Sequence, residues 1–396
     1  MRNKISLLGL SLLMSAFIFA QPCTTPSLRT ANNQFAFDVY KGLLKGSSPV
    51  FFSPYSIYTA LHMTGEGAKG ITATEMQQTL HSTGLVNCIR QDIQYSLKQF
   101  NLSEEMGDSI RTANALWLQD GFPVNPEFSN LVADSYKAGL HMTDFSNNPE
   151  GGRQAINTWT ADQTNNRIKE LLVKGVVTTG TRLVLVNTIW FKGKWTDPFK
   201  KENTAEKMFY AEKDSVKVPF MNNTSVVKYA ENELAQLIEL PYRSNKLSMY
   251  IILPVKGKET DFEKSFNEEK LRGWLDTMQA EKTSIHLPKF KMECSFQLGD
   301  MLQSLGMHSA FTLAADFSGI SQTPLKISAV IHKSFIEVDE AGTEAAAATA
   351  VVMTRSVSVQ LPEKPRKVFT ADHPFIFMLC DRETKTILFM GKLNKP

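Results

Sequence analysis

The stretch from residue 337 to residue 362 constrains this chain most, and it reads EVDEAGTEAAAATAVVMTRSVSVQLP. Up to Asp339, apolar and polar residues alternate as they do in a strand. An acidic turn with Gly342 follows, and after Thr343 and Glu344 come four successive alanines, Ala345, Ala346, Ala347 and Ala348.

Three local structures remain open for this stretch. Alanine and glutamate are good helix formers, so a short helix fits. The low aromatic content also fits a disordered linker. As a strand, the segment would carry small uncharged side chains on one face, from Thr343 to Met353, and could enter the middle of an existing sheet. Composition alone favours the helix or the linker over this third, two-state interpretation.

The sequence EVDEAGTEAAAATA resembles the hinge of the reactive-centre loop in serpins, the serine protease inhibitors. Further segments resemble serpin signatures in the family's order, and one of them is the strand that contains His332. The others are FFSPYSIYTAL at 51–61, NTIWFKGKW at 187–195, LPKF at 287–290, FTADHPFIF at 369–377 and FMGKL at 389–393. Several independent motifs in one order make the resemblance specific.

The resemblance implies an α+β serpin fold with three β-sheets, eight or nine helices and an exposed reactive-centre loop at about 340–362. The same fold class follows from the residues, because helical patterns dominate the first half and strand patterns the second. The implied hinge consists of Glu340, Gly342, Thr343, Glu344 and the four alanines, and its side chains are expected to be exposed in the native protein. The resemblance also implies a monomer without a cofactor.

Local patterns predict individual elements. Ser53 before Pro54 predicts a helix start, and Thr72 with Glu75 predicts a capping box for the next helix. Helices are predicted at 30–45, from 54, at 72–81, 89–97, 126–139, 153–164, 260–280 and 295–305. Strands are predicted at 110–118, 182–191, 234–240, 247–253, 284–292, 325–338, 374–380 and 386–393. The run at 182–191 is apolar throughout, which is typical of a strand buried on both faces.

The beginning of the chain predicts export. Arg2 and Lys4 precede an apolar stretch that ends at Ala20, so residues 1–20 fit a secretory signal peptide. A single secreted domain at 21–396 would follow. The net charge of +3 falls to +1 without the two leading cations, which implies no nucleic-acid or membrane-surface partner.

No catalytic or metal-binding pattern stands out. The seven histidines show no HExxH or clustered Cys/His spacing, and no G-x-S-x-G elbow occurs, so we expect a protein that is not an enzyme and holds no metal. Gly65, Gly67 and Gly70 have dinucleotide-loop spacing but follow a predicted helix, so a helix-ending loop is the better interpretation.

His332 lies in an apolar strand, where a hydrogen-bonded core histidine is the plain interpretation. The resemblance places it with Ser53, Ser56 and Asn187 in the buried polar "shutter" beneath the opening sheet. It places Trp195 in the "breach", where loop insertion begins. Simple core packing explains Trp195 equally well.

The resemblance also implies a mechanism. A protease serine attacks the loop, an acyl-enzyme forms, and the freed loop inserts as a new strand. Counting along the loop puts the cleaved bond at Arg355–Ser356 or one residue later, at Ser356–Val357. We favour Arg355–Ser356, because a trypsin-like pocket needs a cation and Arg355 is the one basic residue between Lys333 and Lys364. An elastase-like target would instead select Ser356–Val357 or a nearby apolar bond.

A non-inhibitory serpin, such as a carrier, chaperone or storage protein, is the alternative function. Such members usually have bulky, charged or proline residues in the hinge, whereas this hinge has Thr343 and alanines. Some serpins bind heparin through the helix matching residues 89–100, but here Arg90 and Lys98 stand with Asp92, so we expect no glycosaminoglycan activation.

Export would permit two kinds of covalent modification. Asn101, Asn222 and Asn223 each begin an Asn-x-Ser/Thr sequon and are candidate glycosylation sites. The wide spacing of Cys23, Cys88, Cys294 and Cys380 and the large core lead us to expect at most one disulfide.

Overall fold

The computed structural model describes residues 27–44, 49–105, 108–343 and 365–396. The predicted signal peptide, Glu344, the four alanines and the candidate bonds at Arg355, Ser356 and Val357 lie outside these residues. The described helices are α1 (Ser27–Leu43), α2 (Pro54–Gly65), α3 (Gly70–Thr79), α4 (Val86–Glu105), α5 (Pro126–Leu131), α6 (Pro149–Gln163), α7 (Glu259–Ser265), α8 (Glu268–Thr277) and α9 (Gly299–Ser304). No helix of the described part is long and apolar enough to cross a membrane.

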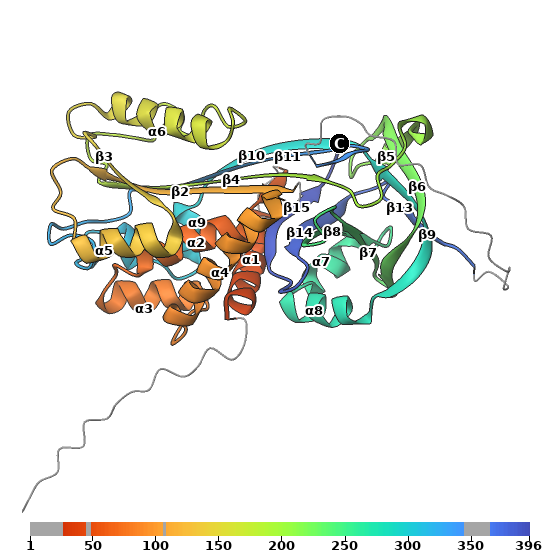
Figure 1. The fold of residues 1–396 in the computed structure, drawn as a ribbon, viewed down its shortest axis with the longest axis horizontal. Coiled ribbons are helices and arrows are strands. Elements are labelled where there is room, and N and C mark those ends of the chain that lie inside the picture. Colours follow the sequence, from red (N-terminus) through yellow and green to blue (C-terminus); the bar gives the residue numbers. More distant parts are fainter. Residues whose placement is uncertain (1–26, 45–48, 106–107, 344–364) are drawn as a thin grey trace, which may run out of the picture.

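A six-stranded sheet runs along the length of the molecule (Figure 1). In spatial order its strands are β10 (Phe290–Gln297), β11 (Ala329–Val338), β12 (Gly342–Thr343), β4 (Leu183–Lys194), β2 (Ser109–Gln119) and β3 (Gly139–Thr143). Strands β4 and β11 pair directly and in parallel from Val184 to Ile189, and further along they separate around the two residues of β12. The predicted buried strand is confirmed, because the residues of β4 are buried from Leu183 to Phe191.

The remaining strands form one nine-stranded sheet. Its order is β1 (Val50–Phe52), β15 (Ile387–Leu393), β14 (Phe375–Asp381), β8 (Leu247–Pro254), β7 (Ala235–Pro241), β6 (Ser215–Glu231), β9 (Gln279–Pro288) and β13 (Lys367–Thr370), with β5 (Ala205–Tyr210) beside β6. The described residues thus form two hydrogen-bonded sheets where the resemblance implies three. The 17-residue β6 joins the strands continuously, because it pairs with β9 from Phe220 to Tyr229 and with β7 from Lys228 to Glu231.

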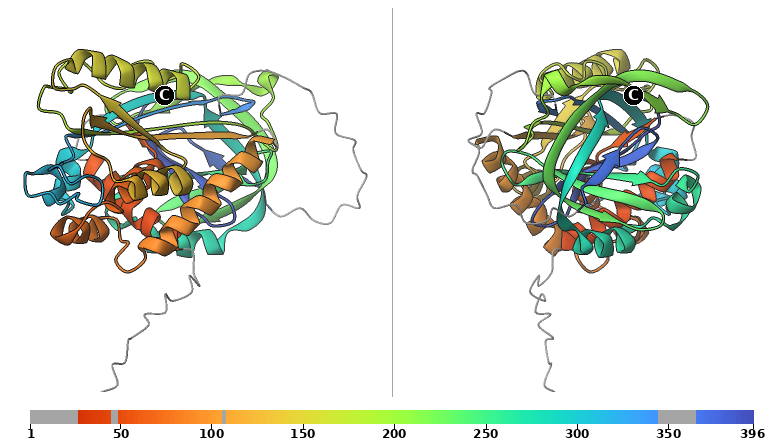
Figure 2. Two further views of the ribbon diagram at one scale, coloured as in Figure 1. Left: turned by 60° about the vertical axis from the view of Figure 1, so that its left-hand side comes forward. Right: turned by 90° about the vertical axis from the view of Figure 1, so that its right-hand side faces the viewer.

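The helices cover the six-stranded sheet from both sides. Helices α1 to α5 and α9 lie beneath it, and α6 lies alone on the opposite face (Figures 1 and 2). The core between the lower helices and the two sheets is rich in aromatic side chains, including Phe35, Phe51 and Tyr58. A second, smaller apolar cluster lies under α6, around Trp117, Phe145 and Ile156. The face under α6 is therefore packed as a core layer of its own.

Several local predictions are confirmed and one is wrong. Ser53 caps α2 through its side chain, which accepts a hydrogen bond from the Ser56 amide. The Gly65–Gly70 segment is a loop between two helices, as expected. The capping box of α3 does not form, because Thr72 and Glu75 accept hydrogen bonds from the amides of Asp316 and Ser309 instead.

Other predicted boundaries shift where strand pairing competes with helix formation. The helix predicted at 295–305 begins only at Gly299, since Gln297 still pairs with β11. The segment 260–280 divides into α7 and α8, and its last two residues open β9. Cys88 is in a disulfide, whereas Cys294 and Cys380 are free and buried, which agrees with at most one disulfide.

Candidate functional site

The hinge enters the six-stranded sheet where β4 and β11 separate. Gly342 pairs with Lys194, and Thr343 pairs with both Gly193 and Val338, so β12 is held by strands on its two sides. The Thr343 side chain is 1% exposed, and its Oγ1 lies 2.7 Å from the hydroxyl of Tyr242. The expectation of an exposed hinge is therefore wrong for Thr343, which already occupies a strand position.

Gly342 explains why the chain can turn into this narrow gap. A Cβ on Gly342 would overlap the carbonyl oxygen of Gly193, and the backbone has a φ of +155°, which side-chain-bearing residues rarely adopt. The Asp339 carboxylate also caps the turn by accepting hydrogen bonds from the amides of Ala341 and Gly342 at 2.8 and 3.2 Å. The turn is thus a fixed entrance to the sheet.

Glu340 fastens the chain just before this entrance. Its carboxylate is buried, forms an ion pair with Lys289 at 2.9 Å and accepts a hydrogen bond from Thr204 at 2.8 Å. Burial alone would raise the pKa of Glu340, but the hydrogen bonds from Lys289 and Thr204 bring it below its usual value. The carboxylate is therefore held in its charged form at neutral pH.

Trp195 lies directly over the hinge turn. Its indole nitrogen donates a hydrogen bond to the Asp339 carbonyl at 3.0 Å, and its ring stacks on Tyr242 with 4.6 Å between centroids. Its amide also donates to the Ala341 carbonyl. Trp195 thus packs in the core and also contacts the hinge turn. That loop insertion begins here stays a prediction.

A row of buried polar residues crosses the same sheet below the hinge. His332 on β11 is opposite Asn187 on β4, which in turn is opposite Asn114 on β2. The Nδ1 of His332 lies 2.7 Å from Oδ1 of Asn187, whose Nδ2 donates to the Oδ1 of Asn114 at 2.6 Å. The polar row therefore links the two strands that separate around β12.

Two serines of α2 complete the cluster. The amide of Ser53 donates to Nε2 of His332 at 3.0 Å, and Asn187 donates to the Ser56 side chain at 2.6 Å. Since Nε2 accepts, the His332 proton lies on Nδ1 and is donated to Asn187. Burial lowers the pKa of His332 to about 3, so the ring is neutral. The structure brings together all four residues predicted for the shutter.

Comparison with known proteins identifies the family to which this chain belongs. A family model described as Serpin (serine protease inhibitor) matches residues 30–396. The chain belongs to the serpin family. It is 43% identical to an uncharacterized serpin-like protein of Thermococcus kodakarensis over 92% of this chain and 85% of the relative. It is 40% identical to serpin B6 of Pongo abelii, over 93% of this chain and 99% of the relative.

Solved serpin structures resemble this one throughout. Serpin48 of the insect Tenebrio molitor, described as a highly specific serpin, has a TM-score of 0.83 at 31% identity and covers 93% of this chain and 98% of its own. Uncleaved ovalbumin has a TM-score of 0.82 at 29% identity, with 93% and 100% covered. The serpin fold predicted from the hinge motif is confirmed.

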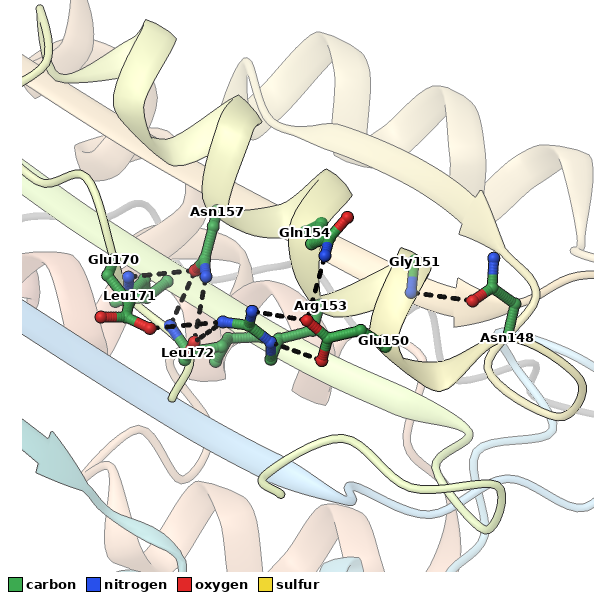
Figure 3. A network of polar contacts seen from close by, with 9 residues as sticks. All are labelled: Asn148, Glu150, Gly151, Arg153, Gln154, Asn157, Glu170, Leu171 and Leu172. Carbon is green, nitrogen blue, oxygen red and sulfur yellow. Dashed lines mark hydrogen bonds and ion pairs between the residues drawn. The ribbon is translucent and has the colours of Figure 1, made fainter. Parts of the chain in front are cut away.

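Sequence reasoning missed Asn114 and the polar contacts of α6. Asn114 lies between two alanines in β2, and a polar residue at this position of the strand predicted at 110–118 was the available signal. On α6, the Asn157 side chain accepts from the amides of Leu171 and Leu172 and donates to the Leu172 carbonyl (Figure 3). Nothing in the local pattern around Asn157 predicts a partner 15 residues away.

Arg153 strengthens the same connection between α6 and the chain that leads to β4. It forms two hydrogen bonds with Glu150 at 2.7 and 2.8 Å and one with the Leu172 carbonyl at 2.7 Å (Figure 3). From the sheet, Lys333 of β11 donates to the Glu170 carbonyl at 3.0 Å. The serpin's α6 is thereby tied to the sheet face on which β4 and β11 meet.

The candidate glycosylation sites differ in their surroundings. Both the amide nitrogen and the oxygen of Asn222 are engaged, by Asn203, Phe220 and Lys207, whereas Asn223 contacts Asp197. The side chain of Asn101 lies outside the described ones, and glycosylation stays a prediction. On α4, the helix that matches the heparin-binding one of some serpins, Arg90 forms an ion pair with Glu66 at 3.1 Å.

Proposed function

We propose that this serpin is a secreted suicide inhibitor that captures a trypsin-like serine protease as a covalent acyl complex. The observation that carries the proposal is the position of β12, because Thr343 already occupies the sheet between β4 and β11. After Glu344 the sequence continues with four alanines, Ala345 to Ala348, and these small residues could continue in the same direction if the two strands separated further. Insertion would then extend a strand that has begun.

The energetics of insertion support an inhibitory role. A new strand of about a dozen residues gains backbone hydrogen bonds of ~0.5–1.5 kcal/mol each, on the order of 10 kcal/mol in total. Opening the sheet breaks the direct β4–β11 pairing between Val184 and Ile189. The shutter residues Asn187 and His332 lie on these two strands, so their hydrogen bond must be exchanged as the strands part.

We assign the reactive bond to Arg355–Ser356, with Ser356–Val357 and an elastase-like protease as the alternative. The assignment rests on the sequence, in which Arg355 is the one cation of the loop's second half. Secretion belongs to the same proposal and rests on the predicted signal peptide at residues 1–20. The monomeric state belongs to it as an implication of the family resemblance.

The test is incubation of the mature protein with trypsin, followed by denaturing electrophoresis and mass spectrometry of the released peptide. The proposal expects a complex that survives SDS and a cut after Arg355. Catalytically inactive trypsin is the control and gives no such complex. Clean cleavage without a complex would instead indicate a non-inhibitory serpin, and turnover of a substrate without consumption of the protein would indicate an enzyme.

A further inference from the structure

A concave, cation-lined cavity of about 370 Å³ lies between two turns of the nine-stranded sheet. One turn joins β7 to β8 and carries Lys246, and the other joins β14 to β15 and carries Arg382 and Lys385. Lys228 of β6 forms a further wall, and Glu383 is the one carboxylate residue among those that line the cavity. Four cations therefore face a space lined by a single anionic side chain.

A buried carboxylate next to the cavity neutralises part of this positive charge. Glu239 of β7 is 2% exposed and accepts from Arg382 Nε at 2.8 Å. Lys228 lies 3.7 Å from the other carboxylate oxygen of Glu239. Arg382 also donates to the side chain of Asn245, so its guanidinium is fixed between the two turns. Glu239 thus anchors Arg382 and faces Lys228.

The other two cations have no such partner. Among the described residues, neither Lys246 nor Lys385 forms an ion pair, and Lys385 Nζ instead donates to the Tyr250 hydroxyl at 3.1 Å. Burial, and then the charges of Lys228 and Arg382, bring the pKa of Lys385 below its usual value, although Glu239 opposes them. Counting Glu239 and Glu383 against the four cations leaves a surplus of two positive charges around the cavity.

We propose that this cavity binds a tetrahedral dianion, namely a phosphate or sulfate group. Such a group matches the surplus charge, and it can accept hydrogen bonds from several directions, which suits cationic donors carried on β6 and on the two turns. The backbones of Asn245 and Lys385 are both left-handed, at φ +60° and +62°, so tight turns fix the positions from which the donors start. The space is open to solvent on one side, so the group could be free or carried on a larger molecule.

Calorimetric titration at low ionic strength tests this proposal, with inorganic phosphate and a monosulfated disaccharide as probes. Sodium chloride at matched ionic strength corrects for screening. The wild-type protein should bind one equivalent of at least one probe. The double variant Lys246→Gln/Lys385→Gln should bind it at least tenfold more weakly, while Lys246→Arg/Lys385→Arg should retain binding. Arg382 is left unchanged because its removal would leave the buried Glu239 carboxylate without its closer ion-pair partner.

The matched control is Lys213→Gln/Lys217→Gln, which removes the same charge from exposed positions on the β5–β6 hairpin. Its affinity should equal that of the wild type. Binding of phosphate alone would assign the cavity to a free anion, and tighter binding of the disaccharide would assign it to a sulfate ester. No binding above the chloride control, or equal loss in the two Gln double variants, would overturn the proposal.

Discussion

At the scale of single residues, Thr343 shows that the start of the hinge is already part of the six-stranded sheet. Because its side chain is buried and faces Tyr242, an arginine there cannot remain silent in the native protein. We predict that Thr343→Arg expels β12 and lowers the free energy of unfolding by about 1–3 kcal/mol. Under the proposed inhibitory function, the variant should be cleaved as a substrate instead of forming a complex. The measurements are a thermal melt and a stoichiometry-of-inhibition titration against trypsin.

Thr343→Ser is the control for this change, because it keeps the hydroxyl that faces Tyr242. It should resemble the wild type in both measurements. An arginine variant with wild-type melting and stoichiometry would show that this position does not enter the sheet.

Arg355 is the residue on which the predicted protease class depends. We predict that Arg355→Ala reduces the rate of trypsin inhibition by at least a hundredfold, because the S1 pocket of trypsin-like enzymes is built around an acidic residue. Lys364→Ala, which removes the next cation of the chain, should leave the rate unchanged. If the Arg355 variant still captures trypsin at the wild-type rate, the reactive bond lies elsewhere.

His332 should make stability depend on pH. Its pKa falls from 6.5 to about 3 on burial, so between these values the unfolded chain binds a proton that the native protein does not. Stability therefore declines as pH falls from 6.5 towards 3, by about 2 kcal/mol at pH 5 from this residue. Denaturant unfolding of the wild type and of His332→Gln should differ in slope against pH. Parallel slopes would mean that His332 is protonated in the native protein.

At the scale of elements, what the sequence predicted depended on how local the cause was. The strand at 182–191 and the turn before residue 247 follow from local apolar patterns, and both are present. The capping role predicted for Thr72 is wrong, because its hydroxyl accepts a hydrogen bond from the Asp316 amide instead of capping α3. Asp316 is distant in sequence, so local pattern could not indicate this partner. The burial of Thr343 could not be predicted either, since it depends on where β4 and β11 separate in space.

Helix α6 offers a prediction at this scale. Asn157 is buried and serves the amides of both Leu171 and Leu172. We predict that Asn157→Ala lowers the free energy of unfolding by about 2–3 kcal/mol, because two amides lose their acceptor. Hydrogen exchange at Leu171 and Leu172 should accelerate before the rest of the molecule opens. Gln154→Ala, an exposed change on the same helix, should affect neither measurement. Equal exchange in the two variants would contradict the role given to Asn157.

At the scale of the whole molecule, the described residues form a six-stranded sheet in which one inner strand, β12, is two residues long. Among the described residues, only the two of β12 lie between β4 and β11, which pair with each other directly from Val184 to Ile189. Glu340 and Trp195 hold the chain at the entrance, so the described part of the hinge, up to Thr343, is fixed in the sheet of the intact protein. Under the proposed function, the uncut loop is tethered at both ends, at Thr343 and where residue 365 leads into β13, and this tether would oppose further insertion.

Cutting that tether gives the last prediction. Cleavage near Arg355 should let the segment after Thr343 insert and complete the six-stranded sheet, adding on the order of 10 kcal/mol of backbone hydrogen bonding. A gain of that size corresponds to a rise in melting temperature on the order of 20 °C. Calorimetry of the intact and cleaved protein measures it directly. Thr343→Arg is the control, because an unpaired charge in the sheet costs several kcal/mol and should reduce the rise. Cleaved wild-type protein that melts at the temperature of the intact form would contradict insertion, since no other consequence of a single cut could supply so large a stabilisation.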